Sequence, residues 1–433
     1  MSRAGFAITK TMGRTMEADT ALFDVLKGLD GEPGERAGFV YHSASEMLAT
    51  VADGRGNVNV SPISLWLALA LVAQGSQGRT LEQLTDTLGI HGLSENQYRT
   101  LVESINQRPP GVKSVMSVHD SVWISATLTP HISFIDEVRH AFAAEVNSID
   151  FSDPNAGKSI SFWISKHTRG LLQPAIECNG TELLSIISTV FADSRWKDPF
   201  EINDTTPAVF HGDQGDATVP FMHQRCEDVP YLCDETFGWE RVDIPFDDDS
   251  ELRIVLPDPG TLETLVHDPI ALRRAFSTEL AETIPQEDKQ ELTGMDRLKA
   301  KLAARKNPAS MPIYANIVTA KVALPRFEID SAINARTLVS ILRSLGITDA
   351  FDPTHADFSG ICEGALAISG IMQGTHIEVN EHGARAAVYT GIAVAGAAPQ
   401  WGPEITFTVD RPFMYALMTR DRLPLFVGAV RNL

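Results

Sequence analysis

The side chains that could carry out chemistry are spread along this chain of 433 residues, and their spacing is not typical of an active site. The carboxylates of Asp247, Asp248 and Asp249 could bind a cation, but such an acidic run is more typical of a solvated hairpin turn. His211 and His223 stand too far apart in a strand-like region to predict a metal site. The sequence contains no GxSxG, HExxH, P-loop or GxGxxG motif. We therefore expect no catalytic nucleophile, no metal ion and no cofactor.

Composition indicates a folded, acidic protein. Hydrophobic residues make up 43% of the chain and charged residues 21%, which is typical of globular proteins. The formal net charge of -20 argues against nucleic acids and heparin-type polyanions as partners. A chain of this length does not need disulfides, so its cysteines are expected to be structural thiols. These are Cys178, Cys226, Cys233 and Cys362.

One segment near the C-terminus, EHGARAAVYTGIAVAGAAPQWGP (381–403), supports two interpretations. Its Gly and Ala content predicts a flexible loop, whereas the alternation of its residues predicts a strand with one buried face. Pro399 and Pro403 would end such a strand, and the pattern alone leaves both interpretations open. One face would carry Ala384, Ala386, Val388, Thr390, Ile392, Val394 and Gly396, and the other would carry Arg385, Ala387, Tyr389, Gly391, Ala393 and Ala395.

The rest of the chain predicts an α+β fold with its helices concentrated early. Ser61 and Pro62 predict the N-cap and first turn of a helix that is apolar on nearly every side and should be buried. Further helices are predicted at 39–51, 131–146 and 159–172, a long buried strand at 183–196, and a run of antiparallel strands between 216 and 257. Residues 1–36 are polar and predict an N-terminal extension, and 280–310 predict a charged helical insertion.

Several blocks, taken in order, resemble the serpin family. The resemblance runs from about Phe39 to the C-terminus and implies a single serpin-type domain at 37–433. It further implies three β-sheets, eight to nine helices and an exposed reactive-centre loop within 381–403. The blocks are NVNVSPISLWLALALVAQGSQGRT (57–80), SRWKDPF (194–200), VPFMHQ (219–224), LPRFEID (324–330), LGITDAF (345–351), ADFSGI (356–361), VNEHGARAA (379–387), DRPFMYALM (410–418) and LPLFVGAV (423–430).

The resemblance implies that the protein is not an enzyme but an inhibitor that a serine protease attacks as a suicide substrate. The protease would cleave the loop and remain attached as an acyl-enzyme, and the freed loop would insert into the main sheet as a new strand. The implied hinge is Glu381, Gly383, Ala384, Arg385, Ala386 and Ala387, and the implied inserting face continues with Val388, Thr390, Ile392 and Val394.

The family's spacing from Gly383 implies a reactive bond between Ala397 and Ala398. A small residue before the cut predicts an elastase-like or subtilisin-like protease as the target. The alternative is a serpin-fold protein that binds a partner or acts like a chaperone without trapping proteases. The inserting face carries no charge or proline, which favours inhibition.

The resemblance also implies a region where the main sheet opens, formed by Trp196, Ser61, Ser188 and Gln373. Ser188 and Gln373 stand where the family usually has Asn and His. Two hinge residues also depart from the family, which usually has Thr or Ser at the position of Ala384 and Glu at that of Arg385. Both are compatible with insertion, since Ala384 is small and Arg385 falls on the outward face.

A target serine protease is the expected partner of a monomeric protein, with loop–sheet polymerisation as its side reaction. Neither nucleic acid, a membrane nor a heparin-type polyanion is expected. Lys10, Arg14, Glu17 and Asp19 interrupt the N-terminal sequence, which therefore predicts neither a secretory leader nor a transmembrane helix. The resemblance favours an extracellular location, and the lack of a leader in this chain leaves a cytoplasmic one open.

Overall fold

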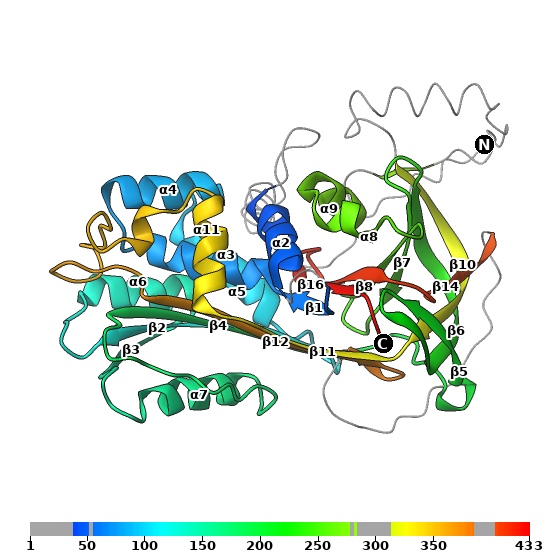
Figure 1. Ribbon diagram of the computed structural model, residues 1–433, viewed down its shortest axis with the longest axis horizontal. Coiled ribbons are helices and arrows are strands. Elements are labelled where there is room, and N and C mark those ends of the chain that lie inside the picture. Colours follow the sequence, from blue (N-terminus) through cyan, green and yellow to red (C-terminus); the bar gives the residue numbers. More distant parts are fainter. Residues whose placement is uncertain (1–37, 52–54, 278–280, 284–312, 385–402) are drawn as a thin grey trace.

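A six-stranded sheet, in the order β11-β12-β13-β4-β2-β3, runs along the molecule in the computed structural model (Figure 1). The structure describes residues 38–51, 55–277, 281–283, 313–384 and 403–433. The strands of this sheet are β2 (Val115–Ser125), β3 (Glu145–Ile149), β4 (Leu184–Arg195), β11 (Phe327–Ile333), β12 (Gly370–Asn380) and β13 (Gly383–Ala384).

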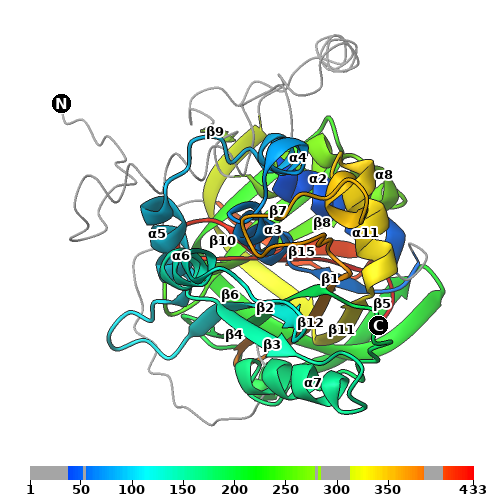
Figure 2. The ribbon, with the colours of Figure 1, turned by 90° about the vertical axis from the view of Figure 1, so that its left-hand side faces the viewer.

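Helices cover both faces of this sheet, but unequally (Figure 2). Helix α3 (Pro62–Ala73) packs against the inner face and is buried along its whole length, as its apolar sequence predicts. Helix α7 (Ala156–His167) lies on the opposite, outer face, where Trp163 packs with Trp123 and Ile187 in a second small core. The remaining α-helices of the described residues are α2 (Phe39–Thr50), α4 (Gly78–Leu88), α5 (Glu95–Asn106), α6 (Ile132–Phe142), α8 (Leu262–Val266), α9 (Pro269–Phe276) and α11 (Ala335–Ser344), with 3-10 turns η2 (Ile202–Asp204) and η4 (Asp349–Phe351).

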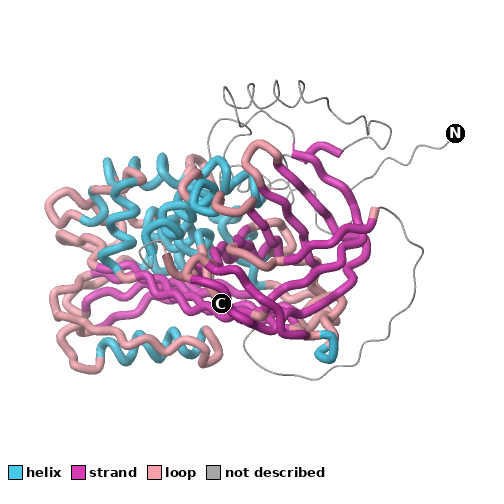
Figure 3. Tube along the Cα trace, turned by 45° about the vertical axis from the view of Figure 1, so that its right-hand side comes forward, coloured by secondary structure: helices cyan, strands magenta, loops and turns pink. Residues whose placement is uncertain are grey.

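A second, ten-stranded sheet fills the other half of the molecule (Figure 3). Its path is β1-β16-β15-β8-β7-β6-β10-β14, with β5 beside β6 and β9 beside β10. The strands are β1 (Val58–Val60), β5 (Thr206–Gly212), β6 (Gly215–Asp234), β7 (Trp239–Pro245), β8 (Glu251–Pro257), β9 (Ala281–Thr283), β10 (Ile313–Pro325), β14 (Glu404–Thr408), β15 (Phe413–Met418) and β16 (Pro424–Val430).

The α+β class and the predicted number of helices are confirmed, since nine α-helices lie in the described residues. The three expected sheets are joined into two by hydrogen bonds. The reason is the length of β6, which spans 20 residues and pairs with β5 and β10 along part of its course and with β7 at its end. One strand therefore belongs to what the resemblance counts as two sheets.

Three smaller expectations need correction or lie outside the described residues. Residues 281–283 form the strand β9 beside β10 rather than the start of a helical insertion, because β10 offers them backbone hydrogen-bond partners. Ser61 stands at the N-cap of α3, but its side chain makes no capping hydrogen bond. The extension 1–36 and all the rest of the segment 280–310 lie outside the described residues. No helix within the described ranges is long and apolar enough to cross a membrane.

The cysteines, the three aspartates and His211, which the sequence singles out as chemically active residue types, have ordinary structural contacts. All four cysteines are free thiols, and burial raises the pKa of Cys226 to about 12. The three aspartates lie in the β7–β8 hairpin, but Asp247 is more than a solvated tip, because its carboxylate accepts hydrogen bonds from the backbone N–H groups of Lys113 and Ser114. His211 pairs with Asp216 within the β5–β6 hairpin.

Candidate functional site

Strands β4 and β12 are parallel neighbours at the centre of the six-stranded sheet. They pair directly from Gly370 opposite Ser185 to Gly374 opposite Thr189. Farther along, the two residues of β13 lie between them and run antiparallel to both. The sheet is therefore closed at one end, while at the other it already holds the beginning of an additional strand.

The two ends of this opening share one register. Ala384 of β13 faces Val379 on one side and Ser194 on the other. Val379 and Ser194 stand in the same relative register as the residues of β12 and β4 that pair directly. For another strand to enter between β12 and β4, these two strands must therefore move apart sideways by about 4.8 Å, which is the spacing between neighbouring strands. Neither strand has to slide along the other.

Gly383 is at the entry point for a steric reason. Its φ of 147° lies in a backbone region that residues with a side chain rarely adopt. A Cβ added at this position would lie 1.8 Å from the carbonyl oxygen of Ser194. That oxygen belongs to the backbone and cannot move aside without breaking the β13–β4 pairing. Glycine is thus required wherever this chain begins to enter the sheet.

Glu381 fixes the chain just before the entry point. Its buried carboxylate accepts hydrogen bonds from Arg326, with Nε at 2.8 Å, and from the hydroxyl of Thr205. Burial raises the pKa of this carboxyl, but the hydrogen bonds outweigh burial and hold the pKa below its usual value. The Glu381 carbonyl also accepts a hydrogen bond from the Phe200 backbone at 3.0 Å. The hinge therefore enters the sheet from a fixed anchor.

Trp196 lies at the same end of the sheet. Its indole N–H donates to the carbonyl of Asn380 at 2.8 Å, and its backbone N–H donates to that of His382 at 3.2 Å. The ring stacks on Phe246 with centroids 4.6 Å apart. Trp196 thus supports the entry point. It stands about 25 Å along the strand direction from Ser188, so these two residues of the predicted opening region lie at separate places in the sheet.

Polar side chains cross the inner face of the sheet near its middle, and we call them the polar row. Cross-strand register sets Ser331 opposite Thr375, Gln373 opposite Ser188, and Ser188 opposite Asp120. Gln373 and Ser188 stand one pair before the end of the direct β12–β4 pairing. Separation of these two strands must therefore disturb the polar row.

The polar row binds β1 and the start of α3. The Gln373 amide accepts from the Ser61 backbone N–H at 2.9 Å and donates to the Ser61 carbonyl at 2.7 Å and to the Ser64 hydroxyl at 3.1 Å. The Ser188 hydroxyl donates to the Ser64 carbonyl over a longer 3.4 Å. Ser64 therefore contacts side chains from both strands that would separate.

The structure brings Ser61, Ser188 and Gln373 together, although Ser61 takes part through its backbone, and its buried hydroxyl has no hydrogen-bond partner among the described residues. Two further residues of this region, Ser64 and Asn59, are not among the residues expected from the sequence. The Asn59 carbonyl accepts a hydrogen bond from the Thr375 hydroxyl at 2.7 Å, and the Asn59 backbone N–H donates one to the Ser331 hydroxyl at 2.9 Å. The available signal was the polar residue at every second position of QGT (373–375), within an otherwise buried alternation of β12.

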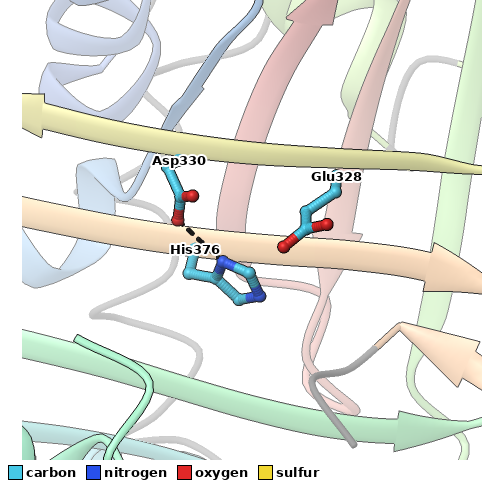
Figure 4. Close-up of side chains that lie close together, drawn as sticks. All are labelled: Glu328, Asp330 and His376. Carbon is cyan, nitrogen blue, oxygen red and sulfur yellow. Dashed lines mark hydrogen bonds and ion pairs between the residues drawn. The ribbon is translucent and has the colours of Figure 1, made fainter.

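The outer face carries one cluster with metal-binding residue types, Glu328, Asp330 and His376 (Figure 4). His376 Nδ1 lies 2.8 Å from Asp330 Oδ1. Glu328 stands opposite Glu378 on β12. Because the Nδ1 nitrogen of the imidazole is hydrogen-bonded to an exposed carboxylate, the arrangement is that of a cross-strand histidine–aspartate pair next to two facing glutamates.

The other predicted site residues lie outside the described ranges: Arg385, Ala386, Ala387, Val388, Thr390, Ile392, Val394, Ala397 and Ala398. The described chain resumes at Pro403, and β14 then pairs in parallel with β10 at the edge of the ten-stranded sheet. The two ends of this segment are therefore fixed to different sheets.

The sequence matches the family model described as Serpin (serine protease inhibitor) over residues 41–433. The human leukocyte elastase inhibitor is 27% identical over 83% of this chain and 88% of its own length. An uncharacterized serpin-like protein of Thermococcus kodakarensis is 24% identical over 95% of this chain and 89% of its own.

Solved structures agree on the fold. Serpin48 of the insect Tenebrio molitor superposes with a TM-score of 0.73 at 23% identity, covering 97% of this chain and 100% of that one. Native tengpin, a thermophilic serpin, gives a TM-score of 0.72 at 23% identity, covering 91% and 94%. With a family model that spans nearly all of the described chain, the protein belongs to the serpin family, which includes protease inhibitors.

Proposed function

We propose that this protein inhibits a serine protease by trapping it as an acyl-enzyme, with insertion of the cleaved loop between β4 and β12. The observation that carries the proposal is β13, where Gly383 and Ala384 already pair with both strands. Parallel pairing is slightly weaker per residue than antiparallel pairing. Insertion would replace the parallel β4–β12 contact by two antiparallel ones and thus supply a driving force.

Extending the β13 register residue by residue gives the inserted strand a specific set of neighbours. Thr390, the only polar residue among 384, 386, 388, 390, 392 and 394, would lie between Ser188 and Gln373 of the polar row. The other inward residues would meet apolar side chains for the most part: Ala386 between Ala192 and Ile377, Val388 between Val190 and Thr375, and Ile392 between Ile186 and Ile371. The match in polarity supports both insertion and this register.

The outward residues match their expected neighbours as well. Arg385 would lie between Asp193 and Glu378, two acidic residues of the outer face. Opposite charges on adjacent strands stabilise a sheet by about 0.2–1 kcal/mol per pair. This gives a reason for arginine at a hinge position where the family usually has glutamate, since a glutamate there would face two carboxylates.

Two further outward positions fit the space available. Tyr389 would lie beside Gly374, which has no side chain to oppose the ring. Gly391 would lie between Ile187 and Met372, which pack in the small core under α7, where a larger residue would press on the helix. The size pattern of the loop thus follows the surface it would enter.

We further propose that the reactive bond joins Ala397 and Ala398, so that elastase-like or subtilisin-like enzymes are the targets. The similarity to the leukocyte elastase inhibitor supports this class of target. The proposed inhibitor acts as a monomer and needs no polyanion, because its net charge of -20 repels one. A non-inhibitory serpin that only binds a partner is the second candidate, and the departure that the proposed register does not explain is Ala384, where the family usually has Thr or Ser.

A pair of loop variants separates these functions. Wild-type protein mixed with an elastase-like protease should give a covalent complex on a denaturing gel. Thr390→Arg should be cleaved without trapping, because its charge would be buried on the polar row, whereas Tyr389→Arg at the next, outward position should still trap. Cleavage of the wild type with no complex would favour the non-inhibitory function, and equal loss in both variants would contradict the register. Mass spectrometry of the released peptide checks that it begins at Ala398.

A further inference from the structure

Asp120 ends the polar row on the side away from Gln373. It lies on β2 directly opposite Ser188, and only 4% of it is exposed. Its Oδ1 atom is buried and has no hydrogen-bond partner within the residues that the structure describes. Most buried carboxylates are paired with a cation or accept several hydrogen bonds, so this one needs an explanation.

No cation faces Asp120 from the elements packed against it. Helix α3 carries no ionisable side chain, and Ser188 of β4 is flanked on the same face by Ile186 and Val190. The other titratable residues nearby are turned elsewhere: Glu95, Arg99 and Glu103 of α5 face solvent or one another, Tyr98 of α5 packs on Phe142, and His119 of β2 and Glu145 of β3 contact His167.

The surroundings control the proton on Asp120. Burial raises the pKa of its carboxyl from 3.8 to about 7, and the hydrogen bond with Ser188 lowers it only in part. The Ser188 hydroxyl has a single proton, which it can donate to the Ser64 carbonyl at 3.4 Å or to Asp120. An ionised carboxylate is the stronger acceptor, so ionisation draws the Ser188 hydroxyl away from α3.

We propose that Asp120 is a proton-dependent latch on sheet opening. When Asp120 is protonated, Ser188 stays bonded to Ser64 and β4 is held on the same residue as β12. When Asp120 is ionised, β4 is released from α3, and a negative charge is left under the closed sheet. Loop insertion would then be faster. The latch rests on the proposed function only in its effect on trapping, because its effect on stability does not involve a protease.

The sign of the stability effect follows from the direction of the pKa shift. A carboxyl whose pKa is raised by folding gives its full stabilisation below its unfolded value of 3.8, and loses it as the pH rises to about 7. Asp120→Asn keeps the shape of the protonated form at every pH. The variant should match the wild type near pH 4 and become more stable than it at pH 8, with a ratio of unfolding equilibrium constants on the order of a hundred- to a thousand-fold.

Urea unfolding of the intact chain at several pH values measures this ratio. Asp193→Asn is the matched control, since Asp193 is buried on β4 but paired with Arg195, and its loss should destabilise the protein at neutral pH. Asp120→Ser serves as a second variant if the amide distorts the site. If the difference in free energy of unfolding between the wild type and both Asp120 variants does not change with pH, the assignment of the proton to Asp120 is overturned.

The second measurement is the number of inhibitor molecules consumed per protease trapped, at pH 6 and pH 8. Comparing the wild type with Asp120→Asn at each pH cancels the pH dependence of the protease itself. As the pH rises, the number of wild-type molecules consumed per trapped protease should fall relative to that of the variant. A ratio that stays constant, despite a pH-dependent stability difference, would overturn the latch. If no complex forms at any pH, the proposed function fails, while the unfolding data still decide the state of Asp120.

Discussion

Two buried polar regions of this protein are built in opposite ways. The polar row under the six-stranded sheet consists of neutral groups apart from Asp120. Within the described part of the chain, one Asp120 oxygen and the neighbouring Ser61 hydroxyl have no hydrogen-bond partner. The second region, which we call the ion network, lies between the ten-stranded sheet and α9. It is made of charged side chains that are paired closely: Arg241 with Asp243, Arg253 with Glu251, and Arg274 with Asp234.

The ion network also binds the backbone of α9. Arg241 donates to the carbonyl of Ala275 at 2.7 Å and Arg253 donates to that of Phe276. Arg274 contacts Asp234 with Nε at 3.0 Å and Nη2 at 2.8 Å. Charged hydrogen bonds of this kind are costly to break once buried, so the helix and the sheet are expected to stay together when the loop inserts.

The difference reflects what each region must do. Neutral hydrogen bonds contribute only about 0.5–1.5 kcal/mol each and can be exchanged one for another. In the proposed mechanism, the polar row can therefore hold β4 and β12 in the closed sheet and still accept Thr390 between Ser188 and Gln373 when the loop inserts. A buried ion pair in the same position would have to be broken at each insertion, and it would prevent the sheet from opening.

The largest expected effect comes from breaking the ion network. Arg274→Leu leaves the buried Asp234 carboxylate without this partner and should reduce the free energy of unfolding by about 3–5 kcal/mol. The number of inhibitor molecules consumed per trapped protease should not change, because α9 does not take part in opening. Urea unfolding and gel titration measure the two quantities. A large rise in that number would show that the ion network takes part in opening.

An intermediate effect is expected where the loop enters, away from both polar regions. Gly383→Ala brings a Cβ to 1.8 Å from the Ser194 carbonyl oxygen, and it should cost about 1–3 kcal/mol as β13 leaves the sheet. Cleavage by the protease should continue while trapping is lost, as seen on a denaturing gel. Gly111→Ala is the control, since Gly111 also has a positive φ but no atom within 4 Å of an added Cβ. Trapping by Gly383→Ala at the wild-type level would contradict entry at this point.

The sequence predicts these regions unequally. The buried helix α3 and the long buried strand β4 follow from local patterns and are confirmed. The family resemblance predicts the hinge at Gly383, because the motif is local. The polar row joins six elements, the strands β11, β12, β4 and β2 with β1 and α3, and most of them are far apart in the chain. Only Ser61, Ser188 and Gln373 could therefore be named from family positions.

The charged residues show the limit most clearly. Arg241, Arg253 and Arg274 look like surface residues in the sequence, yet each is at most 1% exposed. Their burial depends on which strands of the ten-stranded sheet meet α9, and no local pattern shows that. Asp120 stands between Val118 and Val122 on the face of β2 that is otherwise apolar, and its lack of a cationic partner among the described residues is visible only once β2 and β4 are paired.

The smallest expected effect on stability belongs to Ser188→Ala, and it tests the comparison most sharply. The bond from Ser188 to Ser64 is long at 3.4 Å, so its loss should reduce the free energy of unfolding at pH 6, where Asp120 is mostly protonated, by less than about 1 kcal/mol. Trapping should nevertheless become more efficient at pH 6, because β4 is no longer held on α3. The advantage should shrink at pH 8, where ionised Asp120 has already released the wild-type serine.

Thr189→Val is the matched control, since its hydroxyl bond to the His119 carbonyl is of similar length, at 3.3 Å, but lies on the outer face. An equal gain in both variants, or a gain for Ser188→Ala that does not depend on pH, would mean that the polar row does not control opening through this hydroxyl.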